Sequence, residues 1–67
     1  MISVSINGEQ ENIEAGLSLT QLIALKALTH KKIAVELNEE ILPARKFDEI
    51  IIQMNDQIEI VQAIGGG

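Results

Sequence analysis

The stretch Ile2-Ser3-Val4-Ser5-Ile6-Asn7-Gly8 decides how the chain begins to fold. Apolar and polar residues alternate through it, which is the period of a β-strand with one buried face. Asn7-Gly8 is the strongest short signal for a two-residue turn between antiparallel strands. The sequence therefore predicts an N-terminal hairpin. Its returning strand, Glu9 to Glu14, is mostly polar, which predicts a charged strand at a protected edge of the sheet.

A helix is predicted after this hairpin. Ser18-Leu19-Thr20-Gln21 has the spacing of a capping box, so we expect the helix to begin at Leu19. The Lys26 stem should lie on apolar surface with its ammonium in water. The apolar stripe of the helix should contain Leu19, Leu22, Ile23, Leu25 and Leu28. We expect the helix to end near Leu28 to Thr29, because the cluster His30-Lys31-Lys32 would lie favourably beside its negative C-terminal dipole.

The second half of the chain has the pattern of strands again. Three segments are predicted from their apolar residues: Ile33 to Leu37, Ile41 to Leu42, and Gln57 to Ile64. Pro43 ends the second segment or confines it to a sheet edge. Ile58 and Ile60 should share one face of the last strand, whose apolar content suits a central position. A loop or short helical turn at 44–49 and a brief apolar run at 50–52 precede that strand.

This order of elements predicts the fold class. Two strands, one helix and two or three further strands form an α+β roll, in which one main helix covers one face of a mixed sheet of four or five strands. The last strand can then lie in the sheet centre, parallel to the first, and direct the C-terminus out of the sheet. We expect one domain over residues 1–64 and a flexible glycine tail over residues 65–67.

Composition disfavours several functions. The chain has 67 residues, no cysteine and a net charge of −5, with 10 acidic residues against 5 lysines and arginines. Without cysteine there is no thiolate metal site, and the acidic balance disfavours binding to nucleic acid. No apolar stretch approaches the ~20 residues that span a bilayer, so we expect a soluble, cytoplasmic protein without a membrane anchor. No nucleophile, base, metal-ligand set or phosphate loop stands out, so we expect no catalytic residue, no metal and no enzyme activity.

The remaining reactive group is at the end of Ile64-Gly65-Gly66-Gly67. Three glycines form a thin segment that reaches about 10 Å and fits a narrow channel, so the useful group is the Gly67 α-carboxylate at its tip. A carboxylate is a poor electrophile, because its charge repels nucleophiles and its oxygens are poor leaving groups. Coupling to AMP from ATP removes both obstacles. A sulfur donor can then attack the acyl carbon and leave a thiocarboxylate.

Four segments of the chain resemble the ThiS family of sulfur carriers in thiamine biosynthesis. They are Ile33-Ala34-Val35-Glu36-Leu37-Asn38, Glu40-Ile41-Leu42-Pro43, Asp56-Gln57-Ile58-Glu59-Ile60-Val61 and Ile64-Gly65-Gly66-Gly67. The resemblance covers nearly the whole chain and is strongest from Ile33 onward. It implies a ubiquitin-like β-grasp fold. Two departures concern turns, since this chain has Asn38-Glu39 and Asn55-Asp56 where the family often has Asn-Gly and Gly-Asp.

The resemblance also implies a mechanism with partners. A ThiF-type adenylyltransferase would activate the Gly67 carboxylate with ATP, a sulfur donor protein would supply the sulfur, and thiazole synthase would accept it. Gly67 is then the residue that carries the acyl adenylate and the thiocarboxylate. Ile64, Gly65 and Gly66 would form the part of the tail that enters the partners' active sites. The chain itself would bind no cofactor, since the partner uses the ATP.

Other functions and surfaces stay open at this point. The small subunit of molybdopterin synthase resembles the chain in fold, tail and activation chemistry, although it usually runs longer and has a more aromatic approach to its glycines. A ubiquitin-like modifier would join its glycine carboxylate to lysines, and an interaction domain would not need the tail. On the sheet face away from the helix, Ala34, Val61 and Ala63 are candidates for a docking patch. The basic pairs Lys31-Lys32 and Arg45-Lys46 are interpreted as solvated surface.

Overall fold

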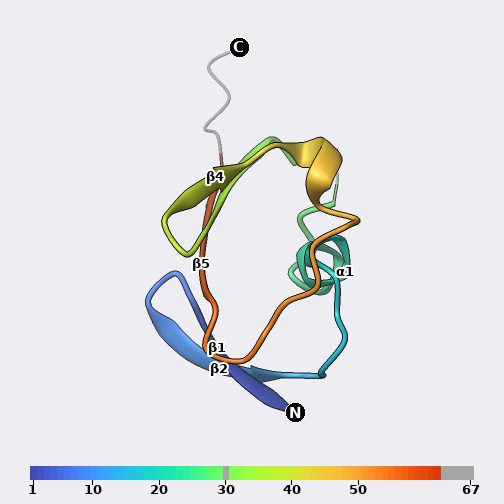
Figure 1. Cartoon of the computed structure of the whole chain (residues 1–67). Coiled ribbons are helices and arrows are strands. Elements are labelled where there is room, and N and C mark those ends of the chain that lie inside the picture. Colours follow the sequence, from blue (N-terminus) through green and yellow to red (C-terminus); the bar gives the residue numbers. More distant parts are fainter. Residues whose placement is uncertain (30, 63–67) are drawn as a thin grey trace.

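One face of the sheet packs against the helix in the computed structural model, which describes residues 1–29 and 31–62. The elements, in chain order, are β1 (Ile2–Ile6), β2 (Glu9–Ile13), α1 (Leu19–Leu25), β3 (Ile33–Leu37), β4 (Glu40–Leu42), the 3₁₀ helix η1 (Ala44–Lys46) and β5 (Gln57–Gln62). The strands follow the order β2-β1-β5-β3-β4. β1 and β5 are parallel, and the other neighbours are antiparallel. The predicted α+β roll with a central last strand is confirmed, and Figure 1 shows α1 lying across from β5.

Both hairpin turns of the sheet use residues with positive φ. Asn7 and Gly8 have φ of 50° and 84°, the pattern of the type I′ turn that suits the twist of β1 and β2. The predicted N-terminal hairpin and the edge position of β2 are confirmed. Asn38 and Glu39 have φ of 51° and 71° between β3 and β4. Because the Cβ of a left-handed residue crowds the following carbonyl oxygen, Glu39 makes this second turn at a local energetic cost.

The helix α1 begins as predicted. The Ser18 Oγ accepts a hydrogen bond from the Gln21 N–H at 3.1 Å, and the Gln21 Oε1 accepts one from the Ser18 N–H at 2.9 Å. These reciprocal bonds complete the capping box, so two amides of the first turn are satisfied without water.

The predicted end of the helix at Leu28 to Thr29 is wrong. α1 ends at Leu25, with Lys26 as its C-cap. Ala27 has φ of 60°, and the N–H groups of Ala27 and Leu28 donate to carbonyl oxygens one turn back, at 3.0 Å in both cases. This is a Schellman motif, in which glycine usually occupies the left-handed position. An alanine there carries no stop signal, so the sequence does not reveal this end.

Two side chains near the end of the helix also lie differently from the prediction. Leu25 is 70% exposed, because it lies on a side of α1 that borders an open groove and is not covered by the sheet. The Lys26 ammonium does not extend alone into water but donates to both carboxylate oxygens of Glu11, at 2.7 and 2.8 Å. This ion pair ties the end of the helix to the edge strand β2.

The elements from β3 to the start of β5 lie where the sequence predicts them, and the apolar run before β5 forms no strand. β3 matches its predicted range, and β4 is a short edge strand that ends before Pro43. The loop at 44–49 contains η1. The apolar run at 50–52 is not a strand, since Ile51 makes only an isolated bridge with Ser18. The predicted continuation of the last strand to residue 64 lies outside the described residues, as does His30.

The core is aliphatic. Its buried members come from the helix, from four of the strands and from the segment before β5: Val4, Ile6, Ile13, Leu19, Leu22, Ile23, Val35, Ile52, Ile58 and Ile60. Full burial of each such side chain stabilises the fold by about 1.5–3 kcal/mol. Ile58 and Ile60 of β5 both point into this core, as predicted. The chain's one aromatic ring, Phe47, packs half-buried at the margin.

Candidate functional site

The residues predicted to carry the chemistry, Ile64, Gly65, Gly66 and Gly67, lie outside the described residues. The structure does describe the strand that leads to them, β5, up to Gln62. It also describes the surfaces on either side of that strand. The described part of the candidate site therefore consists of the end of β5 and the groups that position it.

β5 is paired unevenly along its length. It pairs with β1 only at its start, where Ser5 lies opposite Gln57 and Ile6 opposite Ile58. It pairs with β3 as far as Gln62. The last part of β5 therefore extends beyond β1 and is held by β3 on one side. Gln62, the described end of β5, lies at the end of the sheet opposite the N-terminus (Figure 1), and we call this end of β5 the root of the tail.

Two asparagines from the hairpin turns hold β5 in place. The Asn7 Oδ1 accepts a hydrogen bond from the Ile60 N–H at 2.7 Å, which extends the contact between β1 and β5 beyond their last residue pair. The Asn38 Oδ1 accepts one from the Gln57 N–H at 2.9 Å, and its Nδ2 donates to the Asp56 Oδ1 at 3.0 Å. From the sequence, these asparagines are predicted only to form turns. Their second role follows from the side-chain amide, which can both permit positive φ and cap a neighbouring strand.

An exposed apolar patch lies beside the root of the tail, on the sheet face away from α1. Ala34 of β3 lies directly opposite Val61 of β5, so both residues share this face, and Val61 is 61% exposed. The structure thus brings together two of the three predicted patch residues, whereas Ala63 lies outside the described residues. Ile41 of β4 is 72% exposed and lies opposite Glu36, which places it on the same face. We call Ala34, Ile41 and Val61 the outer patch.

Ile41 was missed because a three-residue strand carries too little alternation to assign its faces. Its neighbours in β4 are Glu40 and Leu42, and either face of the pattern Glu-Ile-Leu suits a core. The register with β3 decides the question, because it pairs Ile41 with the outward-facing Glu36.

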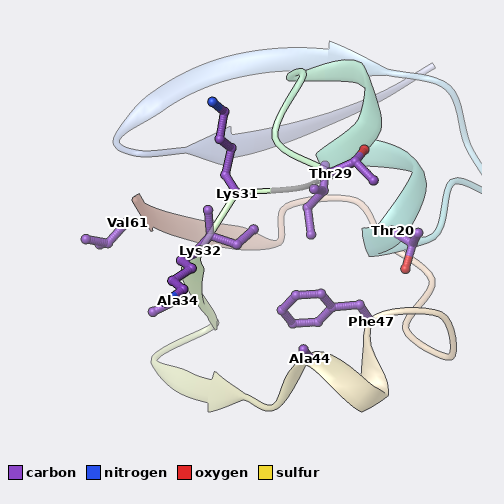
Figure 2. Close-up of a pocket in the computed structure, with 10 residues that line it drawn as sticks. Thr20, Thr29, Lys31, Lys32, Ala34, Ala44, Phe47 and Val61 are labelled. Atoms are coloured by element: carbon purple, nitrogen blue, oxygen red, sulfur yellow. The ribbon is translucent and has the colours of Figure 1, made fainter. Parts of the chain in front are cut away.

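A pocket of about 530 Å³ adjoins the outer patch. Its walls come from α1, the segment before β3, the start of β3, η1 and the end of β5, and the lining residues are Thr20, Ile23, Thr29, Lys31, Lys32, Ile33, Ala34, Ala44, Phe47 and Val61. Figure 2 shows the Phe47 ring directed into the pocket, with the Lys31 side chain extending away from it. Ala34 and Val61 belong to both surfaces, so the pocket and the outer patch are continuous at the root of the tail.

The position of Phe47 is fixed by the start of α1. The Thr20 hydroxyl donates to the Asp48 carboxylate, and the Leu19 N–H donates to the Ile50 carbonyl oxygen at 2.8 Å. The Thr20 N–H donates to the Phe47 carbonyl oxygen at 3.3 Å. The helix N-terminus therefore holds the 47–50 segment in place and with it the aromatic wall of the pocket.

The basic residues gather around this pocket. Lys31 and Lys32 line it, and Ala44, which lines it as well, is followed by Arg45 and Lys46. All four basic side chains are exposed, which fits the predicted solvated surface. The pocket thus combines an apolar interior with a positive rim, a combination that suits an apolar protein surface bordered by acidic groups.

The described part of the chain shows neither a metal site nor a membrane-spanning helix. Among residues 1–29 and 31–62, no three or more His, Asp and Glu side chains form a group that could hold a metal ion. Within the same residues, no helix is long and apolar enough to cross a membrane.

Fold and site together define the class of protein. A mixed five-stranded sheet around one helix, with the central strand leading into a glycine tail, is a ubiquitin-like β-grasp domain. The solved structure of the thiamine biosynthesis protein ThiS from Geobacter metallireducens has the same fold. It superimposes with a TM-score of 0.83 at 30% sequence identity, and the match covers 98% of this chain and 100% of that chain.

Residues 4–67 match the ThiS family, and the chain belongs to this family. The protein ycf40 of Porphyra purpurea is 39% identical over 66 residues, which are 98% of this chain and 93% of that protein. The thiazole synthase of Magnetococcus marinus is 36% identical over 66 residues, again 98% of this chain. The chain spans only 20% of the length of that thiazole synthase. Family and fold support a sulfur-carrier role for this chain.

Proposed function

We propose that the chain delivers sulfur for thiazole formation in thiamine biosynthesis, with the Gly67 carboxylate as the C-terminal group that is loaded. The observation that carries the proposal is the sequence Ile64-Gly65-Gly66-Gly67 close behind the central strand of a ThiS-family domain. Three residues without side chains give the tail a small cross-section, so a partner's active site can close around it.

Loading begins with activation of the carboxylate. A Gly67 carboxylate oxygen attacks the α-phosphorus of ATP, pyrophosphate leaves, and an acyl adenylate forms in the active site of a ThiF-type adenylyltransferase. A sulfur donor then attacks the acyl carbon, and AMP leaves with the electron pair of the carbon–oxygen bond. Sulfide as the donor gives the thiocarboxylate directly. A persulfide donor gives an acyl disulfide instead, and a thiol of the partner then forms a disulfide with the donor and releases the thiocarboxylate. Every acid, base and metal that these steps use belongs to the partners, so the chain acts as a carrier and not as an enzyme.

The folded domain contributes recognition. The outer patch and the basic pocket adjoin the root of the tail, so a partner that contacts them receives the tail at a fixed place. Apolar contact there excludes water, and the lysine rim selects an acidic border on the partner. The Asn7 and Asn38 hydrogen bonds hold β5, and therefore the tail root, relative to these surfaces.

Thiazole synthase is the proposed acceptor of the sulfur. The thiazole synthases of Magnetococcus marinus and Paramagnetospirillum magneticum each contain a segment similar to this chain, at 36% and 37% identity, which makes up about a fifth of their length. A carrier-like domain and a protein named for thiazole formation thus share one polypeptide in these organisms. This supports a direct transfer from the present chain to such an acceptor.

Reconstitution tests the proposal. The chain is incubated with ATP, a ThiF-type adenylyltransferase and a sulfide source, and its intact mass is measured. We expect a product heavier by the difference between sulfur and oxygen. Deletion of Gly67, or one alanine added after it, should abolish this product while the circular dichroism spectrum stays unchanged. A full yield from either variant would refute the role of Gly67.

The acceptor is tested with the loaded carrier. Thiocarboxylated chain is offered separately to thiazole synthase with its other substrates and to the large subunit of molybdopterin synthase with its precursor. We expect the loaded form to disappear only with thiazole synthase. Transfer to the molybdopterin partner alone would assign the chain to the other sulfur pathway, and stable adducts on lysines would make it a protein modifier.

A further inference from the structure

The edge strand β2 has unused hydrogen-bonding groups. On β1, the N–H groups of Ser5 and Asn7 donate to β5, at 2.9 and 2.8 Å, so the odd-numbered residues of β1 direct their backbone toward β5. Its even-numbered residues therefore bond to β2, which makes Val4–Glu11 a hydrogen-bonded pair. The backbone groups of Gln10 and Asn12 then point away from β1. Within residues 1–29 and 31–62, no backbone group pairs with them.

A groove of about 550 Å³ runs between this free edge and α1. Apolar side chains line it from β2, from α1 and from the segment between them, among them Ile13, Leu17 and Leu22. Its apolar rim is open to solvent, since Met1 is 81% and Leu25 70% exposed. The groove and the open backbone lie next to each other, because Asn12 lines the groove as well. An extended peptide can therefore bond to β2 through its backbone and place alternate side chains in the groove.

Charge selects the kind of peptide. Glu11 and Glu14 line the groove, and Glu9 precedes them at the start of β2. Lys26 is the basic group that lines the groove, and it is paired with Glu11. A second copy of β2 on this edge would bring these glutamates against their own equivalents, and like charges on facing strands are destabilising. A strand with lysine or arginine beside its apolar residues is complementary instead.

We propose that the β2 edge and the groove beside α1 bind an extended, basic segment of a partner protein, with apolar residues at alternate positions, as an additional strand of the sheet. This surface is separate from the one assigned to sulfur transfer. β2 and β4 are at opposite edges of the sheet, with the tail-bearing β5 between them. A partner on β2 leaves the outer patch and the tail root accessible, so both sites can be occupied together.

The probe is a short fluorescent peptide with valine at alternate positions and lysine at the positions between and beside them. A control peptide has glutamate in place of every lysine. A second control retains the lysines but has N-methyl groups on the amides that would face β2. Binding is measured by fluorescence anisotropy at low salt, and the site is mapped from amide shifts of the isotope-labelled chain. We expect the basic peptide to bind about tenfold more tightly than either control, with the largest shifts at Gln10 and Asn12.

Variants of the chain distinguish backbone pairing with β2 from non-specific electrostatic attraction between the peptide and the acidic chain. Asn12→Pro removes an outward-facing N–H that the fold does not use, and proline is tolerated at such edge positions. Leu25→Lys changes a side chain that is already 70% exposed, so the fold should survive even if the proline variant does not. It removes an apolar contact and repels the lysines of the peptide. Both variants should reduce binding of the basic peptide by about tenfold or more. Ile41→Lys adds the same charge at an exposed site on the opposite edge strand, so it is the matched control and should leave binding unchanged.

Four results would overturn the proposal: no binding of the basic peptide, equal binding of basic and acidic peptides, amide shifts centred on the outer patch, or self-association of the chain that Asn12→Pro abolishes. The last result would make a second copy the occupant. Adenylation of Gly67 is measured in parallel in the Asn12→Pro variant. If the peptide does not bind but Gly67 is adenylated, the proposal for β2 is wrong and the role of the tail is unaffected.

Discussion

The Asn7 side chain offers a sharp test of how the fold holds the strand that leads to the tail. Asn7→Gly retains a residue that accepts positive φ at the first turn position, so the hairpin can still form. What the substitution removes is the acceptor for the Ile60 N–H, a bond of 2.7 Å to a residue that is only 8% exposed. The main effect of the variant is therefore the loss of the side-chain hydrogen bond.

The expected loss of stability follows from the burial of the Ile60 amide. A donor left without a partner in a partly buried place costs about 1 to 3 kcal/mol. Glycine lowers the free energy of unfolding further, by less than about 1 kcal/mol, because it increases the entropy of the unfolded chain. Together these give an expected loss of about 1 to 4 kcal/mol in the free energy of unfolding, and each kcal/mol lowers the Tm of a domain of this size by about 4 to 8 °C.

Urea unfolding followed by circular dichroism measures the free energy, and hydrogen exchange measures the Ile60 amide directly. We expect this amide to exchange faster in the variant by more than the global loss of stability explains. The matched control is Glu39→Gly in the second hairpin turn. It relieves a left-handed glutamate at φ of 71° and should leave stability unchanged or raise it. Equal stability and equal Ile60 protection in Asn7→Gly and the natural chain would refute the reasoning.

Three further substitutions test other parts of the structure. Ala27→Gly places glycine at the left-handed position of the Schellman motif, at φ of 60°, and should raise the Tm, with a gain of up to about 1 kcal/mol; a lower Tm would contradict the assigned helix end. Leu22→Ala removes a side chain with no exposed surface and should cost about 2 to 5 kcal/mol by urea unfolding; a cost under 1 kcal/mol would place Leu22 outside the core. Val61→Asp changes a 61% exposed residue of the outer patch, so it should raise the KM of adenylation without lowering the Tm; an unchanged KM would remove the patch from the partner interface.

Local signals in the sequence predicted most of the elements. Asn7-Gly8 and the capping pair Ser18 and Gln21 each determine their structure within four residues, so no knowledge of distant contacts was needed. The alternation of Ile58 and Ile60 correctly indicated a strand with one buried face, and the apolar content of that strand correctly indicated the sheet centre. The order of these elements then left few topologies that bury every apolar face.

The errors have a common origin in tertiary contacts that override local preference. Ala27 adopts a left-handed conformation without glycine, because the return of the chain toward β3 requires the helix to stop there. Leu25 looked like a core residue by spacing, yet the sheet does not extend over that side of α1, and it borders an open groove. The outward face of Ile41 depends on its register with β3, which no local pattern encodes.

The candidate site also has one part that the sequence predicts and another part that only the fold reveals. The glycine tail was predicted from the sequence alone, because its chemistry depends on residue type and order. The surfaces beside it required the fold: the pocket joins Thr20, Lys32, Phe47 and Val61, which are far apart in the chain. The open edge of β2 was predicted as a protected edge, but the groove beside it depends on where α1 packs.

The most direct test of the sulfur-carrier account is the intact mass of the protein isolated from its own cells, with fragmentation of its C-terminal peptide. The account predicts a polypeptide that ends at Gly67, with a fraction heavier by the difference between sulfur and oxygen and the added mass on that last residue. A polypeptide that continues unprocessed beyond Gly67, or sulfur found on another residue, would contradict it.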